Sequence, residues 1–150
     1  MCFPSFPGFA GGTVIRATDK ELAEPCVRAW NDFYKDERCA TAPDRYIPLA
    51  ILPVRDIDAA VAEAERVAAK GVRTVSFPDS PVPLGLPSFH SEHWDPLWRV
   101  CSDTHMPISL HLGSGSFVPG FSLASMRPAP GQMHPPMPRS PSPPRCSPPT

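Results

Sequence analysis

The chain has 150 residues, of which 41% are hydrophobic, with a formal net charge of -1 and a pI of about 6.5. A charge this close to zero gives no electrostatic preference for nucleic acid or an anionic membrane, and we expect neither as a partner. No apolar run approaches the ~20 residues of a membrane span, and the N-terminus lacks the pattern of a signal peptide. The five cysteines form no C-x-x-C pair, which favours reduced thiols. We therefore expect a cytoplasmic protein.

The first half of the sequence contains the patterns of a loop, a helix and a strand, in that order. The first twelve residues are rich in Pro, Phe and Gly, which predicts a loop, one that could approach a site. Thr18 and Glu21 have the spacing of a capping box, and apolar residues then recur every three or four positions, which predicts a helix over residues 19–39. Residues 46–52 (YIPLAIL) form a short apolar run between prolines, typical of a strand buried on both faces.

A second helix and strand follow directly. Asp56 is placed to cap an alanine-rich helix over residues 57–70, and Gly71 is placed to end it. Residues 72–77 (VRTVSF) then predict another buried strand.

The third helix and strand come after a long loop rich in Pro and Gly, residues 78–94. Asp95 as N-cap and Pro96 in the first turn predict the start of a helix that ends near His105. Residues 106–112 (MPISLHL) predict the third strand. Because helices and strands alternate and each connection is long enough for a crossover, the sequence predicts an α/β fold with about three parallel strands.

Five short motifs occur in a fixed order along this part of the chain. They are DRYIPLAILP (44–53), VSFP (75–78), LGLPSFH (84–90), HWDPLW (93–98) and SLHLG (109–113). Together they resemble the amidohydrolase-related family that includes the aminocarboxymuconate semialdehyde decarboxylase type, from about residue 3 to residue 116. The resemblance implies a metal-dependent (β/α)8 TIM barrel, which is incomplete here because a whole barrel needs about 250 residues. We assign residues 1–120 to this partial barrel domain.

The resemblance also implies site residues at the strand ends. His111 would be a ligand of a divalent metal, with Zn2+ the expected ion. Phe77 and Pro78 after the second strand, and His90 and His93 in the next loop, would line the substrate pocket. The alternatives are a core or cap role for His111, loop packing for Phe77 and Pro78, and local hydrogen bonding for the two loop histidines. No catalytic acid, base or nucleophile is identified.

The activity implied by the resemblance is hydrolysis or non-oxidative decarboxylation of a small-molecule carboxylate or amide. The family mechanism needs an H-x-H-like pair and a late aspartate, and the sequence contains neither. A catalytic zinc usually has three protein ligands, so we expect a fragment, cut upstream of its first ligands, that is inactive by itself. A barrel portion leaves strand edges exposed, and we expect it to dimerise or aggregate.

Residues 121–150 differ in composition from the rest and are interpreted as a separate, disordered proline-rich tail. All 15 acidic residues lie at or before Asp103, and ten of the 23 prolines fall within residues 127–150. One explanation is a shifted reading frame, because back-translation of residues 132–150 permits a string that resembles the family segment after the third strand. The other is a natural proline-rich segment, which gives an alternative function: a non-enzymatic α/β scaffold whose tail binds SH3- or WW-type partners.

Overall fold

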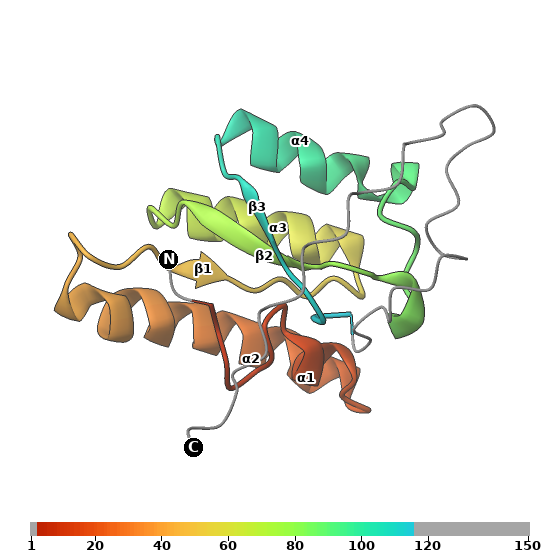
Figure 1. Ribbon diagram of the computed structural model, residues 1–150, viewed down its shortest axis with the longest axis horizontal. Helices are drawn as coiled ribbons and strands as arrows, with labels where there is room; N and C mark the ends of the chain where they lie inside the picture. The colour runs from red at the N-terminus through yellow and green to blue at the C-terminus, as the bar shows by residue number, and fades with distance from the viewer. Residues whose placement is uncertain (1–2, 116–150) are drawn as a thin grey trace, which may run out of the picture. The chain divides into compact units, whose positions relative to one another are not determined.

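The computed structural model describes residues 3–115, and this part of the chain contains a parallel β-sheet flanked by helices (Figure 1). The sheet has three strands in the order β1-β2-β3, which are β1 (Leu49–Ala50), β2 (Thr74–Pro78) and β3 (Ile108–His111). Helix α3 (Ile57–Ala69) joins β1 to β2, and α4 (Asp95–Asp103) joins β2 to β3. The predicted α/β class with parallel strands is confirmed. The predicted tail lies outside the described residues.

The N-terminal part is more helical than the sequence predicted. A short helix α1 (Gly12–Ile15), which was not predicted, begins at the last residue of the expected loop, and α2 (Lys20–Phe33) follows. The helical path then continues through a π-helical turn, Tyr34–Arg38, and a 3-10 turn, Cys39–Thr41. The single helix predicted over residues 19–39 is therefore confirmed in extent, whereas its last two turns have a different geometry.

The observed helix caps differ from the predicted ones in two of three cases. Asp56 caps α3 as predicted, since its carboxylate accepts hydrogen bonds from the backbone N–H groups of Asp58 and Ala59 at 2.9 and 3.0 Å. The capping box at Thr18 was wrong, because the carboxylate of Asp19 instead accepts from the N–H of Leu22 at 3.0 Å.

The cap predicted for α4 was also wrong, because a 3-10 turn, Glu92–Trp94, runs directly into that helix. The helical path therefore begins at Ser91, whose backbone is extended and whose hydroxyl accepts from the N–H of His93. Asp95 lies inside the helical path instead of at its start. Another 3-10 turn, Val82–Leu84, lies earlier in the loop between β2 and α4.

Strand β1 has only two residues, although the apolar run spans residues 46–52. A side chain from α2 replaces a neighbouring strand at the next position. The amide oxygen of Asn31 accepts from the N–H of Ile51 at 3.0 Å, and its amide nitrogen donates to the carbonyl of Ile51 at 2.9 Å. Both backbone groups of Ile51 are thus paired outside the sheet, which fixes α2 against the end of β1.

Asn31 also belongs to a polar cluster that joins α2 to α3. Its amide donates to the buried carboxylate of Glu63 at 2.7 Å, and the Arg66 guanidinium donates two further bonds to that carboxylate at 2.7 and 2.8 Å. Arg66 and Lys70 both contact Asp32, at 2.8 and 2.6 Å. The hydrogen bonds from Lys70 and Arg66 lower the pKa of Asp32 below its ordinary value. The charge of the buried Glu63 is thus compensated on several sides.

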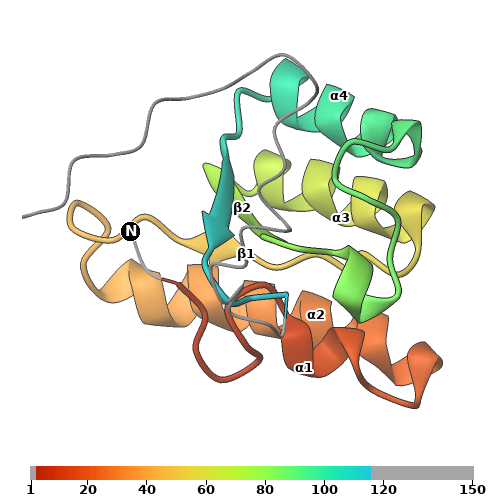
Figure 2. The ribbon, with the colours of Figure 1, turned by 45° about the vertical axis from the view of Figure 1, so that its right-hand side comes forward.

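The two faces of the sheet differ in character. Val75 and Phe77 of β2 point to the outer face, where α3 and α4 both pack, and the two helices lie on the same side of the sheet (Figure 2). Residues on this face and on the two helices form the main apolar core, which includes Ala50, Leu52, Ala60, Ala64, Val67, Val75, Phe77, Trp94, Leu97 and Cys101. The opposite, inner face carries Thr74 and Ser76, and the register sets Ser76 beside Ser109 of β3.

No helix among residues 3–115 has the length and apolar character that a membrane crossing requires.

Two leucines at the end of the last strand, Leu110 and Leu112, are exposed. The predicted dimerisation or aggregation of the chain stays a prediction.

Candidate functional site

The candidate site lies at the edge of the sheet where all three strands end. Because the strands are parallel, Ala50, Pro78 and His111 come at the same edge, and the loops that follow them begin there. In α/β barrels and open α/β sheets, ligands bind at this carboxyl edge. Pro78 pairs with His111 in the register, so both residues lie on the inner face. We therefore place the candidate site on the inner face of the sheet, at the carboxyl ends of the strands.

A hydrogen bond of His111 determines which of its two ring nitrogens carries the hydrogen. Its Nδ1 lies 2.9 Å from the carbonyl oxygen of Leu112. A carbonyl oxygen only accepts, so Nδ1 must carry the hydrogen when the ring is neutral. Nε2 then holds the lone pair, and no hydrogen bond to Nε2 is found among residues 3–115. This is the tautomer in which a histidine can bind a metal ion or accept a proton through Nε2.

Two phenylalanines of the N-terminal segment hold the imidazole from different sides. The ring of Phe9 stacks on His111 with a centroid distance of 3.7 Å and an interplanar angle of 8°, and the ring of Phe3 meets it edge-on at 5.0 Å. The hydroxyl of Ser76 on β2 donates to the carbonyl of Phe9, which anchors the segment on the inner face. The N-terminal segment is thus part of the site. The sequence indicated a loop here that could approach a site, but not that its phenylalanines contact His111.

Asp79, directly after β2, ties the end of β2 to the loop after β3. Its Oδ2 accepts from the N–H of Gly113 at 2.7 Å, and its Oδ1 accepts from the N–H of Gly115 at 2.7 Å and from the hydroxyl of Ser114 at 3.1 Å. The N–H of Asp79 donates to the same hydroxyl at 3.0 Å. A Cβ on Gly115 would lie 2.3 Å from the carbonyl oxygen of Ser80, so this position requires glycine.

Asp79 was missed by the sequence reasoning, although a signal was present. It is the first residue after a buried strand, and acidic residues at that position lie at the carboxyl edge of a parallel sheet.

Phe77 and Pro78 occupy opposite faces of β2, although both were predicted to line a substrate pocket. The Phe77 side chain is 0% exposed on the outer face, where its ring packs edge-on against Trp94 at 4.9 Å and Trp98 at 5.0 Å. Pro78 lies on the inner face opposite His111. Only Pro78 is therefore placed beside the candidate metal ligand, and the substrate contacts of both residues stay predictions.

His90 and His93 lie in the loop between β2 and α4 with exposed side chains. Their backbone N–H groups donate to the hydroxyls of Ser88, at 3.5 Å, and Ser91, at 3.3 Å. The His93 ring also contacts the ring of Trp94 edge-on at 4.7 Å. No hydrogen bond or ring contact joins either residue to His111 in the described part of the chain. Their role in a substrate pocket stays a prediction.

The described residues do not form a complete metal centre. Within residues 3–115, no group of three or more His, Cys, Asp or Glu side chains is placed to hold a metal ion. A catalytic zinc usually has three protein ligands and an open position for water. His111 fits the role of one such ligand, and this part of the chain supplies no partners for it.

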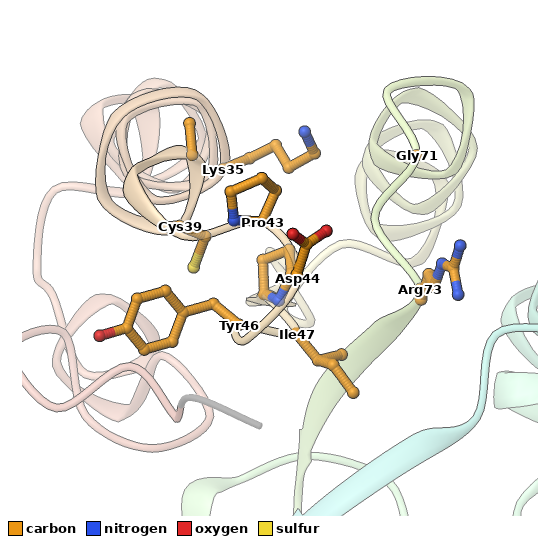
Figure 3. Close-up of a pocket in the computed structure, with 10 residues that line it drawn as sticks. Lys35, Cys39, Pro43, Asp44, Tyr46, Ile47, Gly71 and Arg73 are labelled. Atoms are coloured by element: carbon orange, nitrogen blue, oxygen red, sulfur yellow. The ribbon is translucent and has the colours of Figure 1, made fainter.

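A separate cavity lies at the other edge of the sheet. It has a volume of about 580 Å³ and is lined by Lys35, Cys39, Asp44, Tyr46 and Arg73, among others (Figure 3). Arg73 immediately precedes β2, so this cavity adjoins the amino ends of the strands. In α/β barrels that face contributes to stability, whereas chemistry occurs at the carboxyl face. We therefore do not take this cavity as the candidate site.

The fold and the strand-end histidine define an α/β protein with one candidate metal ligand. A protein-family model described as Amidohydrolase matches residues 2–144, and the chain belongs to the amidohydrolase family. The family resemblance found in the motifs is thus confirmed. Members of this hydrolase family generally depend on a metal ion and act on small molecules. A search of curated proteins finds no match to the chain.

The matched range extends past residue 120, the predicted end of the partial barrel domain, and into the proline-rich residues. Both the boundary at residue 120 and the proline-rich residues lie outside the described residues. The domain boundary, the origin of the tail and its binding of SH3- or WW-type partners stay predictions.

Proposed function

We propose that the chain is part of a metal-dependent (β/α)8 barrel of the amidohydrolase family, in which His111 provides one ligand of a divalent ion, with Zn2+ the expected metal. The sheet supports the barrel, because its strands are parallel and follow chain order, and both connecting helices pack on one face. A doubly wound sheet would change strand order and place helices on both faces.

The position and hydrogen bonding of the His111 ring are the main support for its role as a metal ligand. Its ring lies at the carboxyl end of a parallel strand, Nδ1 is engaged by a backbone carbonyl, and Nε2 holds the lone pair. Metal-binding histidines have this arrangement, in which the second ring nitrogen donates to a carbonyl or carboxylate. The substrate class we propose is a small-molecule carboxylate or amide, hydrolysed or decarboxylated by the complete site.

The chain alone is expected to be inactive, because one histidine does not hold a metal ion as tightly as three ligands do. His111 should nevertheless be the preferred binding position for Zn2+ in the chain. The test is a titration of the 150-residue protein with zinc chloride, followed by the side-chain NMR signals of its histidines at a pH where the rings are neutral. We expect the His111 signals to respond at the lowest zinc concentration.

The same zinc titration is then carried out on three variants. His111→Ala tests the proposed ligand, and two substitutions of exposed loop histidines serve as controls. His111→Ala should remove the first response to zinc, whereas His90→Ala and His93→Ala should leave it unchanged. A first response that survives in His111→Ala and disappears in either loop variant would reject His111 as the ligand.

A further inference from the structure

We propose that Asp79 is a positioning residue for His111 and acts through the peptide group between Leu112 and Gly113. In this arrangement the carboxylate keeps the imidazole in the form with hydrogen on Nδ1 and the lone pair on Nε2. The significance of this for chemistry rests on the proposed function, whereas the hydrogen-bonded arrangement itself can be tested without a metal ion.

One peptide group links the two side chains. Its N–H, from Gly113, donates to Oδ2 of Asp79 at 2.7 Å. Its C=O, from Leu112, lies 2.9 Å from Nδ1 of His111. The carboxylate, the peptide and the imidazole therefore form a continuous series of two hydrogen bonds that ends at the ring.

The negative charge of Asp79 strengthens the second bond through the first. A hydrogen bond to an ionised carboxylate is short and stronger than a neutral one. Consecutive hydrogen bonds polarise one another, so the carbonyl of Leu112 becomes a better acceptor when the N–H of the same peptide is bound to a carboxylate. A better acceptor at Nδ1 favours the tautomer with hydrogen on that nitrogen. Carboxylates that bond directly to a metal-binding histidine have the same effect.

The carboxylate is itself held in place on its other side. Its Oδ1 accepts from the N–H of Gly115 at 2.7 Å and from the hydroxyl of the buried Ser114 at 3.1 Å. The lack of space for a Cβ at Gly115 shows how closely this loop packs on the chain after β2. Asp79 also follows Pro78, the register partner of His111. Its position relative to the imidazole is thus fixed through both the sheet and the loop.

The test is nitrogen-15 NMR of the imidazoles in the 150-residue chain at about pH 8.5, where a histidine of ordinary pKa near 6.5 is neutral. Chemical shifts of the two ring nitrogens report directly which one carries the hydrogen. We expect the Nδ1–H form for His111 in the unmodified protein. Asp79→Asn removes the charge and one acceptor oxygen, and it should lower the ratio of Nδ1–H to Nε2–H forms by about twofold, because polarisation through a peptide group strengthens the next hydrogen bond by about 10–30%.

Ser114→Ala is the matched control, because it removes the hydroxyl contacts of Asp79 and keeps the bond from Gly113. Its tautomer ratio should equal that of the unmodified chain. An equal shift in both variants would show that loop packing, not the peptide link, sets the tautomer, and it would overturn the proposal. So would a folded Asp79→Asn protein with an unchanged ratio.

If Asp79→Asn does not fold, the unmodified chain decides. Detection of scalar couplings across both hydrogen bonds, from the Gly113 N–H to the Asp79 carboxylate and from Nδ1 to the Leu112 carbonyl, would support the proposal. An Nε2–H form, or the absence of either coupling, would overturn it. The zinc titration is independent of this result. A His111 that keeps the Nδ1–H form but does not respond to zinc would reject the proposed function and leave the inference on Asp79 intact.

Discussion

The outer and inner faces of the sheet are built from different kinds of side chain. On the outer face, Val75 and Phe77 are buried against α3 and α4 by apolar contacts alone. On the inner face, Thr74 and Ser76 are equally buried, yet each is engaged in hydrogen bonds with a neighbouring strand or the N-terminal segment. The outer face therefore supplies hydrophobic stabilisation, and the inner face places polar groups in specific positions next to His111.

The largest expected effect comes from the outer face. Phe77→Ala removes a ring with no exposed surface and leaves a cavity among three aromatic neighbours, so it should lower the free energy of unfolding by about 3–5 kcal/mol. Phe6→Ala is the matched control, because its ring is 85% exposed and its loss should change stability by less than about 0.5 kcal/mol. Chemical denaturation followed by circular dichroism measures both. Equal losses would show that the outer face is not the main core.

The sequence predicted the outer face better than the inner one, for a physical reason. Burial of apolar side chains follows local periodicity, and the alternation of helix and strand placed the three strands and the helices that cover them. The family motifs also led to His111 at a strand end. Contacts between remote segments leave no local periodicity. The stacking of Phe9 on His111 and the loop bonds of Asp79 were therefore not predicted.

The length of β1 shows the same limit. The apolar run over residues 46–52 correctly located a buried strand, but the pattern could not show that Asn31 would take both backbone groups of Ile51. Thr18 and Asp95 were wrongly predicted as caps, because Asp19 caps α2 and the helical path into α4 begins four residues before Asp95, at Ser91. Which neighbour becomes the cap depends on the backbone conformation before the helix, and residue types alone do not determine it.

An intermediate effect is expected from a polar group of the inner face. Thr74→Val keeps the side-chain shape and removes the hydroxyl that bonds the carbonyl of Pro107 at 2.7 Å and the hydroxyl of Ser109 at 2.9 Å. Leaving those partners without this bond should cost about 1–2 kcal/mol, less than the outer-face change. Thr18→Val is the control, because Thr18 is exposed and does not cap α2. A loss from Thr18→Val as large as that from Thr74→Val would contradict both assignments.

The smallest effect is expected from Asp32, which belongs to neither face and whose contribution should depend on pH. Hydrogen bonds from Lys70 and Arg66 lower its pKa in the folded protein, so its ionised form is stabilised by folding. Such a group stabilises the protein above its unfolded pKa of about 3.9, and this contribution disappears as the pH falls through the lower folded value. Because the side chain is 40% exposed, solvent screening limits the contribution to less than about 1 kcal/mol.

The pH-dependent contribution of Asp32 is measured by unfolding Asp32→Asn and the unmodified chain from neutral pH down to about pH 3. The difference in the free energy of unfolding should be constant above about pH 5 and shrink below about pH 4. Glu65→Gln provides the control, since Glu65 is exposed on α3 and has no ion pair within residues 3–115. The differences caused by Phe77→Ala and Thr74→Val should not follow this pH dependence, because neither side chain ionises. A difference for Asp32→Asn that stays constant across the acid range would mean that its ion pairs with Arg66 and Lys70 contribute no charge-dependent stability.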